Sequence, residues 1–71
     1  MTQLFSVSYF KENFKQYIEM NKEKSSKIDA MNSYYRSVVS TLIYDQLTKN
    51  AEILKRLQNL DQAYNQVKNE E

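Results

Sequence analysis

Apolar residues recur every three or four positions in the first part of the chain, from Val7 to Ile18. Charged and polar residues fill the positions between them, which is the pattern of an amphipathic helix. The pattern stops at NKEKSSK, residues 21–27, where no side chain is apolar. Ser26 is followed three positions later by Asp29, which is typical of a capping box with Asp in place of the usual Glu or Gln. The sequence therefore predicts one helix over about residues 8–23 and the start of another at residue 26.

A second apolar series runs in two overlapping registers, the first from Ile28 to Leu42 and the second from Ile43 to Val67. The spacing from Ile53 onward alternates between four and three, which matches the seam of a coiled coil. The two registers overlap in YYRSVVSTLIYD, residues 34–45, which is rich in β-branched and aromatic residues. We predict that this segment is helical, because packing outweighs the small helix-propensity cost of these residues. We predict a continuous helix over residues 26–67. A bend near residues 48–50, which are poor helix formers, would instead give three helices.

The composition favours an all-α fold in one domain over residues 1–71. The chain contains no glycine and no proline, the residues on which tight turns depend, while good helix formers are abundant. We predict a helical hairpin in which the short first helix packs on the front half of the long second helix. The predicted intramolecular core consists of Phe10, Phe14, Tyr17, Ile18, Ile28, Met31, Tyr35, Val38, Val39 and Leu42.

The coiled-coil-like C-terminal half of the long helix is expected to need a partner. A domain of this size buries only about 60% of the surface of its unfolded chain, and without Cys or His it gains no disulfide or ordinary zinc site. A helix of about 40 residues would be roughly 60 Å long, and the first helix can cover only about half of it. We therefore predict association, as a homodimer or with another helical protein, through a protein interface. Its apolar and seam residues are Ile43, Leu47, Asn50, Ile53, Leu57, Leu60, Tyr64 and Val67.

Two polar residues of the predicted interface have alternative interpretations. Asn50 occupies a seam position, where a buried asparagine can fix register and oligomeric state, or it marks the end of the packed region near a bend. Arg36 lies next to Tyr35 and Tyr34. It is either on the outer face with its stem along the tyrosine rings or an interfacial anchor. The outer-face interpretation is favoured, because Arg36 falls off the apolar stripe.

The charge balance narrows the class of partner. The chain contains ten Lys and Arg and nine Asp and Glu, so its net charge is close to zero. This balance argues against nonspecific binding to nucleic acid and against binding to an anionic membrane surface. No apolar run approaches the roughly 20 residues that cross a bilayer, and the N-terminus lacks the pattern of a secretory signal. We expect a cytoplasmic protein.

Enzymatic chemistry is not expected. Without His or Cys, a nucleophile would have to be a hydroxyl such as that of Ser37, Ser40 or Thr41. All three lie in predicted helix, where no strained turn projects them, and the carboxylates are dispersed along the chain. The sequence indicates no metal ion and no cofactor.

One segment suggests a different function. LFSVSYF, Leu4 to Phe10, alternates apolar and polar residues as a strand does. A short strand followed by two helices resembles the ribbon-helix-helix family of dimeric repressors, in which paired strands enter the DNA major groove. The resemblance implies that Ser6 and Ser8 would face the bases. The expected function is a non-enzymatic interaction module, a small helical adaptor, chaperone or assembly regulator. The alternative is a ribbon-helix-helix-like transcriptional regulator.

Overall fold

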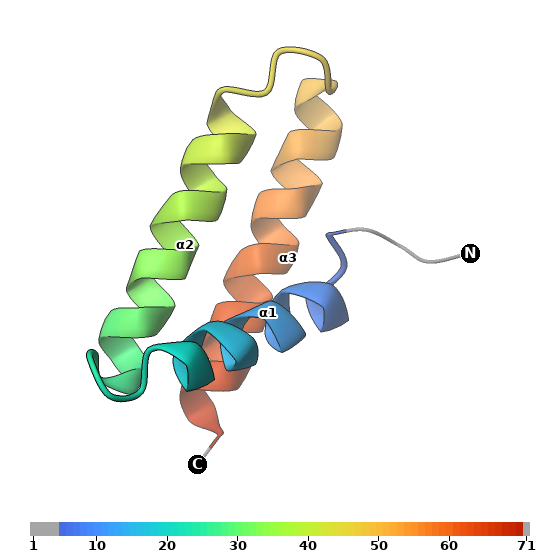
Figure 1. Cartoon of the computed structure of the whole chain (residues 1–71). Coiled ribbons are helices and arrows are strands. Elements are labelled where there is room, and N and C mark those ends of the chain that lie inside the picture. The colour runs from blue at the N-terminus through green and yellow to red at the C-terminus, as the bar shows by residue number, and fades with distance from the viewer. Residues whose placement is uncertain (1–4, 71) are drawn as a thin grey trace.

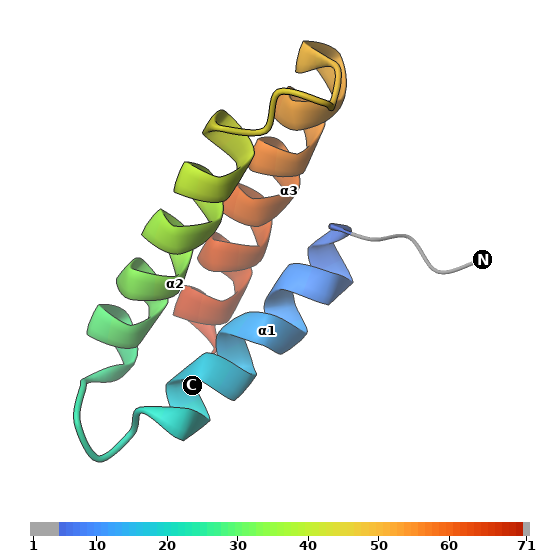
Figure 2. The ribbon, with the colours of Figure 1, turned by 45° about the horizontal axis from the view of Figure 1, so that its top comes forward.

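Residues 5–70 fold into three helices. The computed structural model describes residues 5–70, in which the helices are α1 (Val7–Met20), α2 (Lys27–Ile43) and α3 (Asn50–Asn69). Helices α2 and α3 lie side by side and run in opposite directions, and α1 crosses them at the end formed by the start of α2 and the end of α3 (Figures 1 and 2). The described residues contain no strand, so the predicted all-α class is confirmed.

Helix α1 begins at a serine cap. The Ser6 side chain accepts a hydrogen bond from the Tyr9 amide at 3.2 Å, and the ring of Phe5, just before the cap, lies 6.0 Å from that of Phe10. This pair is the hydrophobic staple that often accompanies an N-cap. The helix ends at Met20, three residues before the predicted boundary.

The predicted start of the second helix is confirmed. Ser26 is the N-cap of α2, and its hydroxyl accepts a hydrogen bond from the Asp29 amide at 3.2 Å. Asp29 also places a negative charge in the first turn, where the helix dipole favours it.

The continuous helix predicted over residues 26–67 is replaced by two helices. Helix α2 ends at Ile43, and α3 begins only at Asn50. The Asp45 carboxylate accepts hydrogen bonds from the Leu47 amide at 2.9 Å, the Thr48 amide at 3.1 Å and the Thr48 hydroxyl at 2.6 Å. An aspartate that bonds its own following backbone competes with helical hydrogen bonds, so the chain turns here without glycine or proline.

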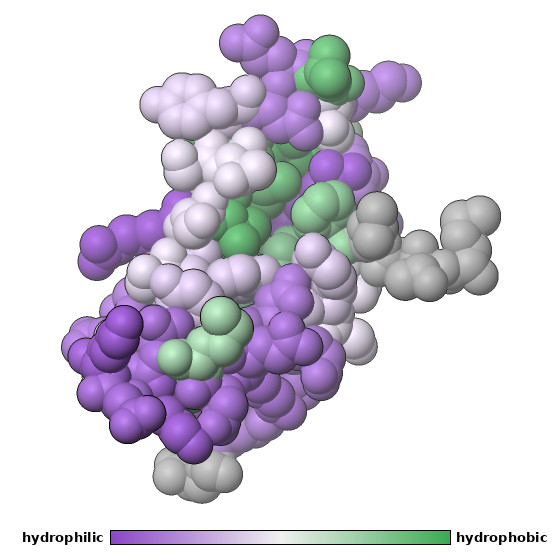
Figure 3. All heavy atoms as spheres, viewed as in Figure 1, coloured by the Kyte–Doolittle hydropathy of each residue, from purple (hydrophilic) through white to green (hydrophobic). Residues whose placement is uncertain are grey.

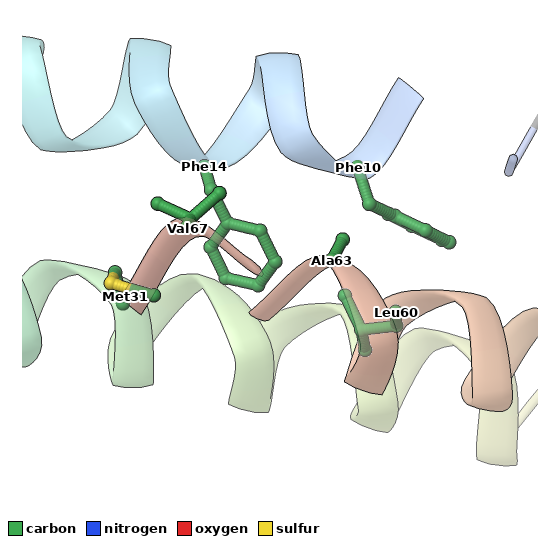
Figure 4. Close-up of a cluster of buried hydrophobic side chains, with 6 residues drawn as sticks. All are labelled: Phe10, Phe14, Met31, Leu60, Ala63 and Val67. Atoms are coloured by element: carbon green, nitrogen blue, oxygen red, sulfur yellow. The ribbon is translucent and has the colours of Figure 1, made fainter. Parts of the chain in front are cut away.

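The three helices share one apolar core. Its buried cluster consists of Phe10 and Phe14 from α1, Met31 from α2, and Leu60, Ala63 and Val67 from α3 (Figure 4). The Phe14 ring meets the rings of Tyr34 and Tyr64 edge-to-face, with centroids 4.9 and 5.9 Å away. The core therefore takes half of its cluster from α3, a part of the chain that the predicted core did not include.

The predicted core residues divide into three groups. Phe10, Phe14, Met31 and Leu42 are buried. Tyr17, Ile18, Tyr35, Val38 and Val39 are half-buried. Ile28 is exposed, which corrects its assignment to the core. It lies in the first turn of α2, in a depression lined also by Lys27, Met31 and Lys68 that is open to solvent, so no side chain covers it completely.

Glu70 ties the end of α3 to the other two helices. Its carboxylate lies 3.2 Å from the ammonium groups of both Lys11 and Lys15 in α1. The Lys27 ammonium donates a hydrogen bond to the Glu70 carbonyl. The two lysine partners of the carboxylate lower the pKa of Glu70. These exposed contacts fix position more than they add stability.

Candidate protein-interaction site

The last part of the predicted seam lies inside the chain's own core. Leu60 is 0% exposed and Val67 is 2% exposed, and Tyr64 packs on the same cluster. The break after α2 turns α3 back, so that α1 covers the end of α3 (Figure 2). Leu60 and Val67 therefore pack on helices of the same chain, whereas Tyr64 is only half-buried and keeps part of its side chain at the surface.

The other predicted interface residues lie outside that buried cluster. Ile43 is 62% exposed and Leu47 is 98% exposed. Ile53 and Leu57 are half-buried, while Asn50 and Arg36 are exposed. That they contact a partner stays a prediction.

The structure adds two apolar residues that were absent from the predicted interface. Tyr44 is 77% exposed and Leu54 is 58% exposed. With Ile43 and Leu47 they belong to the end of the α2–α3 pair that α1 does not reach, and we call these four residues the apolar end. Both of the added residues follow another apolar residue, Ile43 or Ile53. Consecutive apolar residues can share one broad stripe, so the sequence pattern alone did not mark Tyr44 and Leu54 as exposed.

The most exposed residue of the apolar end is held on an ordered turn. Leu47 sits in the connection that Asp45 and Thr48 close with three hydrogen bonds. The hydrogen bond from the Thr48 hydroxyl is the main cause that lowers the pKa of Asp45, and the Leu47 amide adds to it. A binding loop that is already ordered loses less conformational entropy on association.

An open depression of about 330 Å³ adjoins the apolar end. Its lining comes entirely from α2 and the residue after it: Tyr35, Arg36, Val39, Ser40, Ile43 and Tyr44. Arg36 is exposed, as its outer-face interpretation predicts. The depression therefore combines apolar surface with one cation beside two tyrosines.

Asn50 marks a helix boundary. It is the first residue of α3 and is exposed, which agrees with its interpretation as the end of a packed region. Its alternative interpretation, an asparagine that sets register between two chains, stays a prediction.

Apolar atoms are also visible between α2 and α3 beyond the reach of α1 (Figure 3). In that half of the pair, Val39 from α2 and Ile53 and Leu57 from α3 are only half-buried. The surface that could receive a partner thus extends from the apolar end along the uncovered half of the pair.

The strand that the ribbon-helix-helix resemblance requires is absent from residues 5–70, and Leu4 lies outside them. Ser6 caps α1, and Ser8 lies in its first turn. The cap and its staple start a helix where the alternating pattern indicated a strand, which corrects the fold implied by that resemblance.

The hydroxyl candidates Ser37, Ser40 and Thr41 lie exposed on α2. The Thr41 hydroxyl donates to the Ser37 carbonyl at 3.0 Å, an ordinary bond within α2. Over residues 5–70, no three acidic, histidine or cysteine side chains gather as metal ligands would. None of the helices in the same range combines the length and hydropathy of a membrane span.

Comparison with known proteins identifies relatives. Residues 3–70 match the model of the YvfG protein family. The chain is also similar to the uncharacterized protein YvfG of Bacillus subtilis (strain 168). The two are 71% identical over 68 residues, which cover 96% of this chain and 93% of the relative. The matched range includes all three helices and the apolar end. The chain therefore belongs to the YvfG family.

Proposed function

We propose that the chain is a non-enzymatic protein-interaction module of the cytoplasm, a small helical adaptor, chaperone or assembly regulator that binds through its apolar end. The observation that carries the proposal is Leu47, which is 98% exposed on a turn held by Asp45. A leucine fixed in full contact with water gains from any apolar contact, and clustered exposed apolar residues mark binding surfaces. Ile43 and Tyr44 enlarge the surface around it.

The uncovered half of the α2–α3 pair suits a helical partner. Half-buried apolar residues lie on both helices there, Val39 on α2 and Ile53 and Leu57 on α3. An amphipathic helix that presents apolar anchors at every third or fourth position would extend their burial. Such a helix can belong to another protein or to a second copy of this chain. In the second case a two-fold symmetric dimer is the simplest arrangement, because one patch then serves both subunits.

The first test of this function is self-association. We expect the mean mass from light scattering to rise with protein concentration for the wild-type chain. Ile43→Lys combined with Leu47→Lys should abolish that rise, because both side chains are exposed and lysine there opposes apolar contact without disturbing the core. Met20→Lys is the matched control, since Met20 is 78% exposed on another helix.

A partner other than a second copy gives a different result. A wild-type chain that stays monomeric would rule out the dimer, and the module would then have to bind another protein. Crosslinking in the source cell, followed by mass spectrometry, should recover that protein with the wild-type chain and the Met20→Lys variant but not with the double variant. Equal recovery with all three chains would refute the apolar end as the binding surface.

A further inference from the structure

A third open depression lies on the α2–α3 pair. It shares Tyr35 with the depression that adjoins the apolar end, but none of the four residues of the apolar end lines it. Its volume is about 260 Å³, and its lining is polar and aromatic: Asn32 and Tyr35 from α2, and Asp61, Tyr64 and Asn65 from α3. These residues come from the first half of α2 and the second half of α3, which run alongside each other (Figure 1).

Hydrogen bonds within this polar depression leave oxygen acceptors unused. The Tyr64 hydroxyl donates to Asn32 Oδ1 at 2.6 Å, and that oxygen keeps a second lone pair. The Asn65 amide nitrogen donates to the Asp61 carbonyl at 3.1 Å, so its Oδ1 is left as an acceptor. Within residues 5–70, no lysine or arginine forms an ion pair with the Asp61 carboxylate.

Two aromatic side chains also line the depression. The rings of Tyr35 and Tyr64 meet edge-to-face with their centroids 5.3 Å apart. A ring face attracts a cation within about 6 Å of its centroid. Burial raises the pKa of Tyr35, as do the charge of Asp61 and a hydrogen bond between the Tyr35 hydroxyl and its carboxylate. Tyr35 thus stays a neutral phenol and uses one acceptor position of Asp61, while the other positions stay open.

We propose that the polar depression binds a primary ammonium group, supplied either by a free alkylamine or by a lysine side chain. The carboxylate of Asp61 provides the opposite charge. The oxygens of Asp61, Asn32 and Asn65 offer acceptors for the three N–H donors of an ammonium, and the tyrosines border the site. A guanidinium group fits less well, because its planar fork favours two parallel bonds to one carboxylate and a flat ring to stack on.

The test is a titration of the full-length ¹⁵N-labelled chain by NMR. The probe is n-butylammonium, and n-butanol is its neutral counterpart. We expect n-butylammonium to cause saturable shift changes at Asn32, Asp61 and Asn65, whereas n-butanol causes none there. Saturation by n-butanol at the same residues, or no saturable change with the amine, would overturn the proposal.

Substitutions locate the charge that the ammonium recognises. Asp61→Asn keeps the size of an exposed side chain and removes its charge, so the fold is retained and binding should weaken about tenfold or more. Glu12→Gln removes a carboxylate from the exposed face of α1 and should leave binding unchanged. Equal weakening in both variants would mean a general charge effect and would overturn the site.

A second probe distinguishes the two sources of the ammonium. N-acetyl-lysine N-methylamide carries the same group on a peptide unit. If the lysine derivative binds more tightly than n-butylammonium, the site is assigned to a lysine of a protein partner. If the two probes bind equally well, the site is assigned to free amines. The apolar end lies outside this depression, so the titration can fail while the association of the chain stands, and the reverse also holds.

Discussion

The side chain of Asp45 holds the connection between α2 and α3. Its carboxylate replaces the hydrogen bonds that the backbone amides of Leu47 and Thr48 would make in a continued helix. The donors favour the charged carboxylate and lower its pKa. The stability that Asp45 contributes is therefore present above its ordinary pKa and is lost as pH falls through the lowered value.

The Thr48 hydroxyl is the largest cause of that lowered pKa, and this can be tested. Thr48→Val keeps the shape of the side chain but removes the donor, so we expect the pKa of Asp45 to rise towards its ordinary value. A ¹³C NMR titration of the carboxyl group measures it. Thr41→Val, which removes a hydroxyl bound to the α2 backbone, should leave the pKa of Asp45 unchanged. An unchanged pKa in the Thr48 variant would assign the effect to the amides alone.

The same aspartate predicts a local response to acid. In the wild-type chain, hydrogen-exchange protection of the Leu47 and Thr48 amides should fall as pH drops below the pKa of Asp45, because a protonated carboxyl is a poorer acceptor. Asp45→Ala should remove the protection at every pH. Protection that persists in the alanine variant would show that the turn does not depend on this side chain.

At the scale of helices, end signals were readable only where the flanking pattern agreed with them. Ser26 could be predicted as a cap because Asp29 follows it and the preceding segment is wholly polar. Ser6 serves the same purpose but lies in an alternating stretch that also fits a strand. The segment around Asp45, where the helix breaks, contains no glycine or proline. Its sequence signal was an aspartate followed three positions later by a threonine, and this pair is common inside helices as well.

The two serines at the start of α1 give a matched test of that cap. Ser6→Ala removes the acceptor for the Tyr9 amide and should reduce the free energy of unfolding by about 1 kcal/mol. Ser8→Ala, in the exposed first turn, should be neutral or slightly stabilising, because alanine is the better helix former. Urea denaturation of both variants measures the difference. Equal losses would indicate that the Phe5–Phe10 staple, and not the hydroxyl, starts the helix.

At the scale of the whole molecule, the reversal of α3 decides which apolar residues become core and which stay free. The heptad spacing correctly indicated that Leu60 and Val67 are buried, but spacing along one helix does not say which helix covers them. Once the chain turns at residues 44–49, α1 covers the end of α3, and the uncovered surface moves to the opposite end of the pair. Ile43 and Leu47 of the candidate site were therefore predictable from the pattern, whereas Tyr44 and Leu54 required the turn to be known.

Leu60 tests whether α3 completes an intramolecular core or holds a second chain. Leu60→Ala should lower the free energy of unfolding by about 2–5 kcal/mol, because it leaves a cavity beside Phe10 and Phe14. Leu54→Ala, at the exposed start of α3, should lower it by less than about 0.5 kcal/mol. Thermal unfolding followed by circular dichroism compares the two. If the core is intramolecular, Leu60→Ala should reduce the free energy of unfolding by the same amount at low and high protein concentration. Only contacts between chains make stability depend on concentration. A loss that disappears on dilution would return Leu60 to an interface between chains and would require a different placement of α1.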